Sequence, residues 1–147
     1  MDTAKRQSGQ TAVERYLSQQ EQMRFARVAD GQWIVWIPAA EGQSIELQLR
    51  LGDYSLFLTA FFMRAPEENV QEVYRFLLRQ NLEMRVAKFG LNEAGDIFLS
   101  LELPASAISQ ETLDLYLGQL YSYWQQAWGT VLKIGWAKHF GNDNEKR

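Results

Sequence analysis

The chain has 147 residues, of which 46% are hydrophobic and 22% are charged, which is ordinary usage for one globular domain. It contains no cysteine and one histidine. This excludes disulfides, thiolate metal sites and cysteine nucleophiles, and it leaves little imidazole chemistry. Residues 30–128 carry 13 acidic and 6 basic side chains, whereas residues 1–29 carry 3 and 5 and residues 129–147 carry 2 and 4. Such an acidic body repels nucleic acid, because phosphate binding needs clustered lysine and arginine.

The two ends of the chain are polar. Residues 1–10 are expected to be flexible, and no apolar run follows Lys5 and Arg6, so no signal peptide is predicted. No stretch approaches the roughly 20 apolar residues of a membrane helix. We therefore expect a cytoplasmic protein with no membrane contact, in which residues 11–141 form a single domain and residues 142–147 a polar tail.

The first elements predicted are a helix and two strands. The helix runs from Thr11 to about Gln22, because Thr11 and Glu14 have the spacing of a capping box. Residues 25–29 fit a short strand before a turn at Asp30 and Gly31. Residues 32–37 are rich in β-branched and aromatic side chains and are predicted as the first main strand.

Two further strands follow, with different patterns. Residues 44–51 alternate between apolar and polar side chains, which is typical of a strand with one face in water. Residues 54–63 are apolar on both faces. We therefore expect that strand to be covered on both sides, by its own domain or by a partner.

The second half of the chain predicts two helices around a strand pair. One helix spans about Glu67 to Gln80, with Asn81 as its stop. Strands follow at about 85–91 and 96–103. The last helix begins after Ser109, which is a favourable N-cap, and ends at Trp128, because Gly129 is a typical helix terminator. The pattern leaves the conformation of residues 130–147 open.

No residue pattern indicates a reaction. The chain has no glycine-rich phosphate loop, and His139 has no second histidine with which to hold a metal. Ser109 has no partner base and is interpreted as a helix cap. Glu67, Glu68 and Glu72 lie at a helix start, where carboxylates are stabilising without any catalytic role. We expect no catalytic residues, no metal and no cofactor, and hence a protein that is not an enzyme.

Aromatic and aliphatic side chains exceed what one core obviously needs, which predicts either partner surface or a core that is better covered than the pattern shows. Those that lie off the main apolar stripes are predicted to contact a client protein, namely Trp33, Trp36, Tyr116 and Tyr123. A homodimer is predicted through the second helix or the strand before it, by some of Tyr54, Phe57, Phe61, Val73, Tyr74 and Leu77. An alternative is a platform for single-stranded nucleic acid, in which exposed rings act with Arg24, Arg27 and Arg50 and with the basic ends.

Several short motifs resemble the YbjN family, a group of bacterial sensory transduction regulators that shares the type III secretion chaperone-like fold. They are Leu51-Gly52-Asp53-Tyr54, Glu68-Asn69-Val70, Leu77-Leu78-Arg79-Gln80-Asn81-Leu82, Ala87-Lys88-Phe89-Gly90-Leu91, the strand into Leu103-Pro104, and the helix start at Ser109-Gln110-Glu111-Thr112-Leu113. The resemblance covers about residues 30–128, and the apolar segment after it is not part of the pattern.

The resemblance implies an α+β fold with the order α-β-β-β-α-β-β-α, in which helices pack on one antiparallel sheet of about five strands. It also implies a homodimeric, non-enzymatic protein that acts on other proteins. We therefore expect a chaperone-like or regulatory domain that holds client proteins through apolar and aromatic patches, with strand addition at a sheet edge as one possible mode.

Overall fold

A computed structural model describes residues 3–140, so the predicted polar tail at 142–147 lies outside the described residues. One antiparallel sheet has the strand order β1-β2-β3-β4-β6-β5. Its strands are β1 (Arg24–Ala29), β2 (Gln32–Pro38), β3 (Ser44–Leu51), β4 (Ser55–Met63), β5 (Lys88–Leu91) and β6 (Ile97–Pro104). The helices are α1 (Thr3–Ser18), α2 (Val70–Glu83) and α3 (Gln110–Gly135), with short 3-10 turns η1 (Ala40–Gly42) and η2 (Ala105–Ala107).

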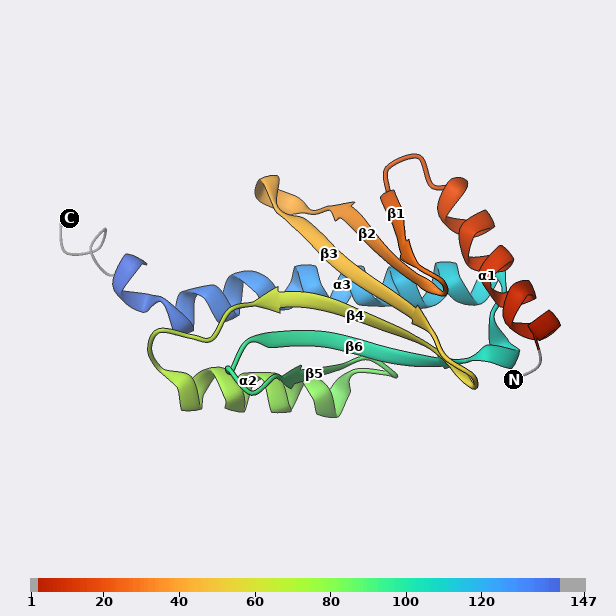
Figure 1. Cartoon of the computed structure of the whole chain (residues 1–147). Coiled ribbons are helices and arrows are strands. Elements are labelled where there is room, and N and C mark those ends of the chain that lie inside the picture. Colours follow the sequence, from red (N-terminus) through yellow and green to blue (C-terminus); the bar gives the residue numbers. More distant parts are fainter. Residues whose placement is uncertain (1–2, 141–147) are drawn as a thin grey trace.

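The predicted fold class and element order are confirmed, with one more strand in the sheet than the five main ones expected. The additional strand is β1, which pairs along its length with β2. The helix α3 lies across one face of the sheet, α1 packs near β3 and the start of α3, and α2 runs beside β5 (Figure 1).

Alternation along the strands places the core on the face that the helices cover. On β3 the odd-numbered residues 45–51 are buried, and on β6 so are Ile97, Leu99, Leu101 and Leu103. They face the stripe of α3 that contains Leu113, Leu117, Leu120 and Trp124, which is also buried. The even-numbered side chains of β3 point to the opposite face, as period two requires.

The predicted start of the first helix at Thr11 is wrong, because α1 begins at Thr3 and residues 3–10 are helical. Thr11 lies inside the helix, where its hydroxyl donates a hydrogen bond to the Gln7 carbonyl at 2.9 Å and so caps nothing. The helix also ends at Ser18, before the predicted Gln22. Its buried residues are Val13, Tyr16 and Leu17, so three side chains attach it to the core.

The predicted ends of the other helices are also wrong. Residue Asn81 lies inside α2, which begins at Val70 and continues to Glu83. Gly129 is an exposed residue within α3, and the helix continues to Gly135. The cost of a helical glycine is about 1 kcal/mol, and burial of Ala127 and Val131 on either side of it outweighs that cost. The Ser109 cap is confirmed: the Thr112 amide donates to the Ser109 hydroxyl at 3.1 Å.

Candidate functional site

The face of the sheet opposite the helices carries aromatic side chains beside arginines. We call this the open face, and its large side chains are Ile34, Trp36, Phe57, Phe61 and Phe98. The Arg24 guanidinium lies 5.9 Å from the centroid of the Trp36 ring. The Arg50 guanidinium lies 4.4 Å from that of Phe57. Phe61 and Phe98 meet edge to face at 5.6 Å.

Acidic side chains balance those arginines on the open face. Glu46 lies opposite Trp36 in the β2–β3 register, and Glu102 lies opposite Phe57 in the β4–β6 register. Between them a row of polar side chains crosses the sheet, formed by Gln48, Thr59 and Ser100. The open face therefore combines partly covered rings with both signs of charge, a composition suited to contact with a protein.

The four residues predicted to contact a client do not form one surface. Trp33 is only 1% exposed and belongs to the core, where its indole N–H donates to Glu14 Oε1 at 3.1 Å. It cannot contact a client unless the domain opens. Trp36 is half-buried on the open face, while Tyr116 and Tyr123 are half-buried on α3. The Tyr123 hydroxyl also accepts a hydrogen bond from the Arg85 amide at 3.1 Å.

The residues predicted for a dimer interface divide in a similar way. Val73 and Leu77 are buried in the core of the single chain and offer no surface. Tyr54 is 82% exposed and Phe61 is 40% exposed, while Phe57 and Tyr74 are half-buried. The other face of β4 is thus open within this chain, so of the two sources of cover predicted for this strand, its own domain or a partner, only a partner remains.

An exposed apolar surface on α2 was missed by the sequence reasoning. Leu78 is 68% exposed and Leu82 is 87% exposed, one helical turn apart. Leu91 of β5 and Val86 of the loop before it are exposed as well, and we call these four residues the α2 patch. Beside it lies a hollow of about 220 Å³ lined mainly by Tyr74, Leu77, Phe89 and Leu91. The i, i+4 spacing of Leu78 and Leu82 was the signal that could have found it.

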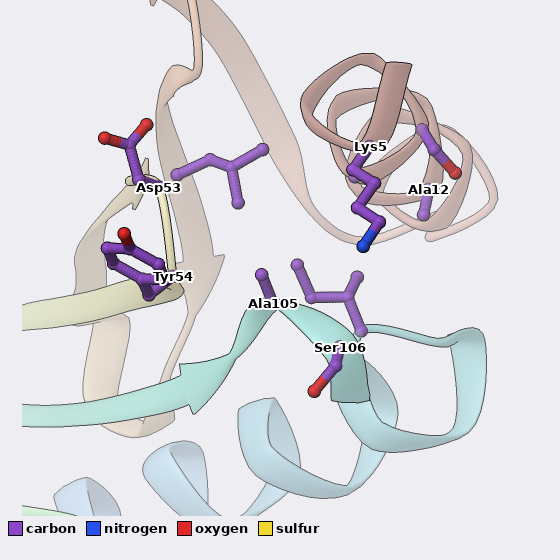
Figure 2. Close-up of a pocket in the computed structure, with 10 residues that line it drawn as sticks. Lys5, Ala12, Asp53, Tyr54, Ala105 and Ser106 are labelled. Atoms are coloured by element: carbon purple, nitrogen blue, oxygen red, sulfur yellow. The ribbon is translucent and has the colours of Figure 1, made fainter. Parts of the chain in front are cut away.

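A hollow of about 560 Å³ opens between α1, the β3–β4 turn and η2. Figure 2 shows Lys5 on the helix side, Asp53 and Tyr54 on the turn side, and Ala105 and Ser106 between them. Asp53 is held by Arg6 at 3.8 Å. The lining mixes apolar side chains with polar ones, which include Ser8 and Ser106.

An aromatic groove of about 590 Å³ lies where the end of α3 passes the start of β3 and the end of β4. We define it by its apolar lining, which is Phe61, Phe62, Met63, Trp124, Trp128, Leu132, Trp136 and Phe140; polar side chains including Ser44, Glu46, Arg64 and His139 complete it. The Trp124 and Trp128 rings stack at 5.8 Å, and Phe62 meets Trp124 edge to face at 5.6 Å. Three of the five tryptophans of the chain thus line one groove.

The Glu67 carboxylate is held by two neighbouring side chains. The Glu67 carboxylate lies 3.4 Å from His139 Nε2 and 2.8 Å from Arg64 Nη2. The hydrogen bond with His139, together with Arg64, holds the pKa of Glu67 below its usual value. Among residues 3–140 no group of three or more His, Cys, Asp or Glu side chains could hold a metal ion. Within the same residues, no helix is long and apolar enough to cross a membrane.

The sequence is similar to a family model and to several known proteins. The sequence model of the YbjN family, described as "Putative bacterial sensory transduction regulator", matches residues 10–127. An uncharacterized Mycobacterium tuberculosis protein is 33% identical over 102 residues, which are 69% of this chain and 56% of that protein. One from Mycobacterium leprae is 30% identical over 113 residues, 76% of this chain and 61% of that protein. The chain thus spans little more than half the length of these relatives.

Two solved structures share the fold. A chain of the HopA1–SchA chaperone–effector complex matches with a TM-score of 0.61 at 17% identity, over 87% of this chain and 97% of the other. A chain of the heterodimeric ExoU–SpcU complex from the type III secretion system of Pseudomonas aeruginosa matches with a TM-score of 0.52 at 14% identity, over 83% and 96%. At these identities the likeness shows the fold alone.

Proposed function

This chain belongs to the YbjN family, and from that premise we propose that it is a non-enzymatic, chaperone-like protein that binds client proteins through apolar and aromatic surface. Its proposed setting is the cytoplasm. The fold is shared with a chain of a chaperone–effector complex and with a chain of a heterodimeric type III secretion complex, which supports a role in holding other proteins. The mechanism would be burial of a client's apolar segment, without a covalent step.

The observation that carries the proposal is the open face. All three helices pack on the other face, so Trp36, Phe57, Phe61 and Phe98 remain partly accessible on a rigid six-stranded sheet. A few large aromatic side chains often dominate a protein interface, and a residue that does so contributes about 2 kcal/mol or more.

We also propose that the protein is a homodimer, with the interface moved from the residues first predicted to the α2 patch. Val73 and Leu77 are buried within the chain, whereas Leu78 and Leu82 of the same helix project from it. Exposed leucines one turn apart are unfavourable in water, and a second copy would bury them.

The client-binding proposal is tested with partners recovered from the native host and then purified. A Trp36→Ala and Phe98→Ser double variant should bind a purified partner at least about tenfold more weakly in calorimetry. A Leu115→Ser variant is the matched control, because Leu115 is an exposed apolar residue on α3, away from the open face. Equal affinity of the wild type and the double variant for every purified partner would reject the open face as the client surface.

A second candidate is binding of single-stranded nucleic acid, which the Arg24–Trp36 and Arg50–Phe57 contacts favour. Glu46 and Glu102 lie opposite the same rings and oppose it. Titration with single-stranded DNA at low and at physiological salt separates the two. Tight binding that persists at physiological salt and is lost in Trp36→Ala would favour nucleic acid over a protein client.

A further inference from the structure

The first residues of β3 and the last residues of β4 are not paired with each other. The pairing of β3 with β4 runs from Leu51 opposite Leu56 to Leu47 opposite Ala60 and stops there. Beyond that point β3 continues to Ser44, paired with β2 alone. A bulge follows Phe61, and β4 continues to Met63, paired with β6 alone. Figure 1 shows the two strands diverging like the arms of a V.

The unpaired start of β3 presents backbone groups toward the opening. The Gly52 amide donates to the Ser55 carbonyl, whereas the Leu51 amide donates to the Gly31 carbonyl, each at 2.8 Å. Because backbone groups alternate sides along a strand, the even-numbered residues of β3 point theirs toward β4. Ser44 and Glu46 continue this alternation, and the register of the described residues gives neither a partner on that side. Both residues are exposed.

The floor of the opening is the aromatic groove. Trp124 lies beneath it, and its indole N–H donates to the Phe61 carbonyl at 3.0 Å, in place of a β3 amide. Trp128, Leu132 and Trp136 extend the floor along α3. These three residues lie beyond residue 127, where the family match ends. The floor is therefore built partly by an extension of α3 outside the matched region.

The extension is fixed in place by the loop before α2. The Gly135 carbonyl accepts hydrogen bonds from the Glu67 and Glu68 amides at 3.1 and 3.0 Å, and the Ile134 carbonyl accepts one from the Asn69 side chain at 3.0 Å. A Cβ at residue 135 would lie 3.1 Å from Pro66 Cβ, so glycine permits this close approach. The groove is thus held open by packed backbone and not by side chains alone.

We propose that this opening binds an extended apolar segment of a partner protein, which pairs its backbone with Ser44 and Glu46 and places alternate side chains on the tryptophan floor. The inference rests on the client-binding function proposed above and assigns it a second site, which adjoins the open face at Glu46 and Phe61. An extended polypeptide is the occupant that fits, because it alone supplies regularly spaced donors and acceptors to a strand edge. Its alternating side chains match an apolar floor on one side and solvent on the other.

The test uses the full chain and a short synthetic peptide in which valine and threonine alternate around a central phenylalanine. The control peptide has the same sequence with N-methylated backbone amides, which removes the donors that strand pairing needs. In nuclear magnetic resonance titrations the first peptide should shift the indole N–H signals of Trp124 and Trp128 and the amide signals of Ser44 and Glu46. The signal of the buried Trp33, outside the groove, should stay unchanged.

Two variants locate the contact. Glu46→Pro removes the amide that faces the opening and leaves the pairing with β2 intact, and Glu46→Gln is its control because it keeps that amide. Phe61→Ser removes a ring at the rim, and Leu115→Ser is its control. Glu46→Pro and Phe61→Ser should each lower the affinity for the peptide by about tenfold or more. The circular dichroism spectrum of Phe61→Ser should be unchanged.

Equal binding of the N-methylated peptide, or shifts outside the groove alone, would overturn the inference. Groove signals that shift with protein concentration in the absence of peptide would assign the opening to a second copy and overturn it as well. A purified client that binds the wild type and both variants equally would overturn this inference and leave the client-binding function standing. The absence of any client binding by the wild type would reject the function itself.

Discussion

At the scale of single residues, the loop between α2 and β5 holds a strained backbone. Val86 has φ = 64°, and the Ala87 amide donates to the Arg85 carbonyl at 2.6 Å. A hydrogen bond from i+2 to i around a residue with positive φ is a γ-turn of the rare, strained kind. A β-branched side chain makes that conformation more costly still. The strain holds an exposed valine within the α2 patch.

Substitution Val86→Gly should stabilise the fold. The substitution relieves strain of about 1–3 kcal/mol. The greater conformational entropy of glycine in the unfolded chain opposes this gain by about 1 kcal/mol. We expect a net gain of about 1 kcal/mol and a melting temperature higher by about 2–4 °C. Val70→Gly is the control, because Val70 is an exposed helical valine outside the left-handed region. It should lower the melting temperature, and an equal loss in both variants would refute the strain.

The Tyr16 hydroxyl predicts a dependence of stability on alkaline pH. It donates to Asp114 Oδ1 at 3.0 Å, and burial, followed by this hydrogen bond and the charge of Asp114, raises its pKa well above the ordinary value near 10. In the unfolded chain the phenol ionises near pH 10, whereas in the folded chain it stays neutral. The stabilisation is therefore complete below that pH and is lost as the pH rises above it.

Chemical denaturation at a series of pH values measures this effect. The wild type should lose stability more steeply above about pH 10 than Tyr16→Phe, which cannot ionise. At neutral pH Tyr16→Phe should be about 1 kcal/mol less stable, the usual net value of one hydrogen bond. Parallel curves for the two proteins above pH 10 would show that Tyr16 does not cause the alkaline loss.

At the scale of elements, the two edges of the sheet are protected differently. The edge strand β5 is closed by the side chain of Asn81, whose amide donates to the Phe89 carbonyl at 3.1 Å and whose oxygen accepts from the Phe89 amide at 2.7 Å. One side chain thus supplies both hydrogen bonds of a strand neighbour. At the other edge, β1 has a bulge between Arg27 and Ala29, a common device against unwanted pairing.

Removal of that side chain should loosen the β5 edge. In Asn81→Ala the Phe89 amide and carbonyl lose their partner, and we expect a loss of about 1–3 kcal/mol in the free energy of unfolding. Hydrogen exchange at the Phe89 amide should accelerate by more than the global change explains. Gln71→Ala, an exposed change on the same helix, is the control. Unchanged exchange at Phe89 would contradict the role assigned to Asn81.

The sequence predicts elements well where a local pattern decides and poorly where distant packing decides. Alternation on β3 and β6 and the Ser109 cap are local signals, and all three were predicted correctly. The α3 helix passes Gly129 because buried contacts on both sides of that residue outweigh its propensity. Val73 and Leu77 share the stripe of Leu78 in the sequence, and only the position of β5 and α3 decides which of them is buried.

At the scale of the whole molecule, one-sided packing divides the surface into regions to which we assign different proposed roles. The helices cover one face, so the open face, the opening between β3 and β4 that adjoins it at Phe61, and the α2 patch remain accessible. A client could occupy the first two while a second copy occupies the third. The sequence could not separate them, because aromatic residues of the core and of the surface alternate along the same strands, as Trp33 and Trp36 do.

The proposed dimer is the test of that division. Leu82 is 87% exposed, so Leu82→Glu does not disturb the core of a single chain. In a dimer that buries the α2 patch it places two carboxylates in an apolar contact, which is strongly unfavourable. We expect the wild type to sediment at twice the chain mass of 17.0 kDa at tens of micromolar, and Leu82→Glu to sediment as a monomer with an unchanged circular dichroism spectrum. Leu115→Glu adds the same charge at an exposed leucine outside the patch and should remain dimeric. A wild type that is already monomeric at that concentration would reject the dimer. A Leu82→Glu variant that remains dimeric would place the dimer interface elsewhere. The next residues to change would then be Tyr54 and Phe61, which belong to the set predicted from the sequence and are exposed.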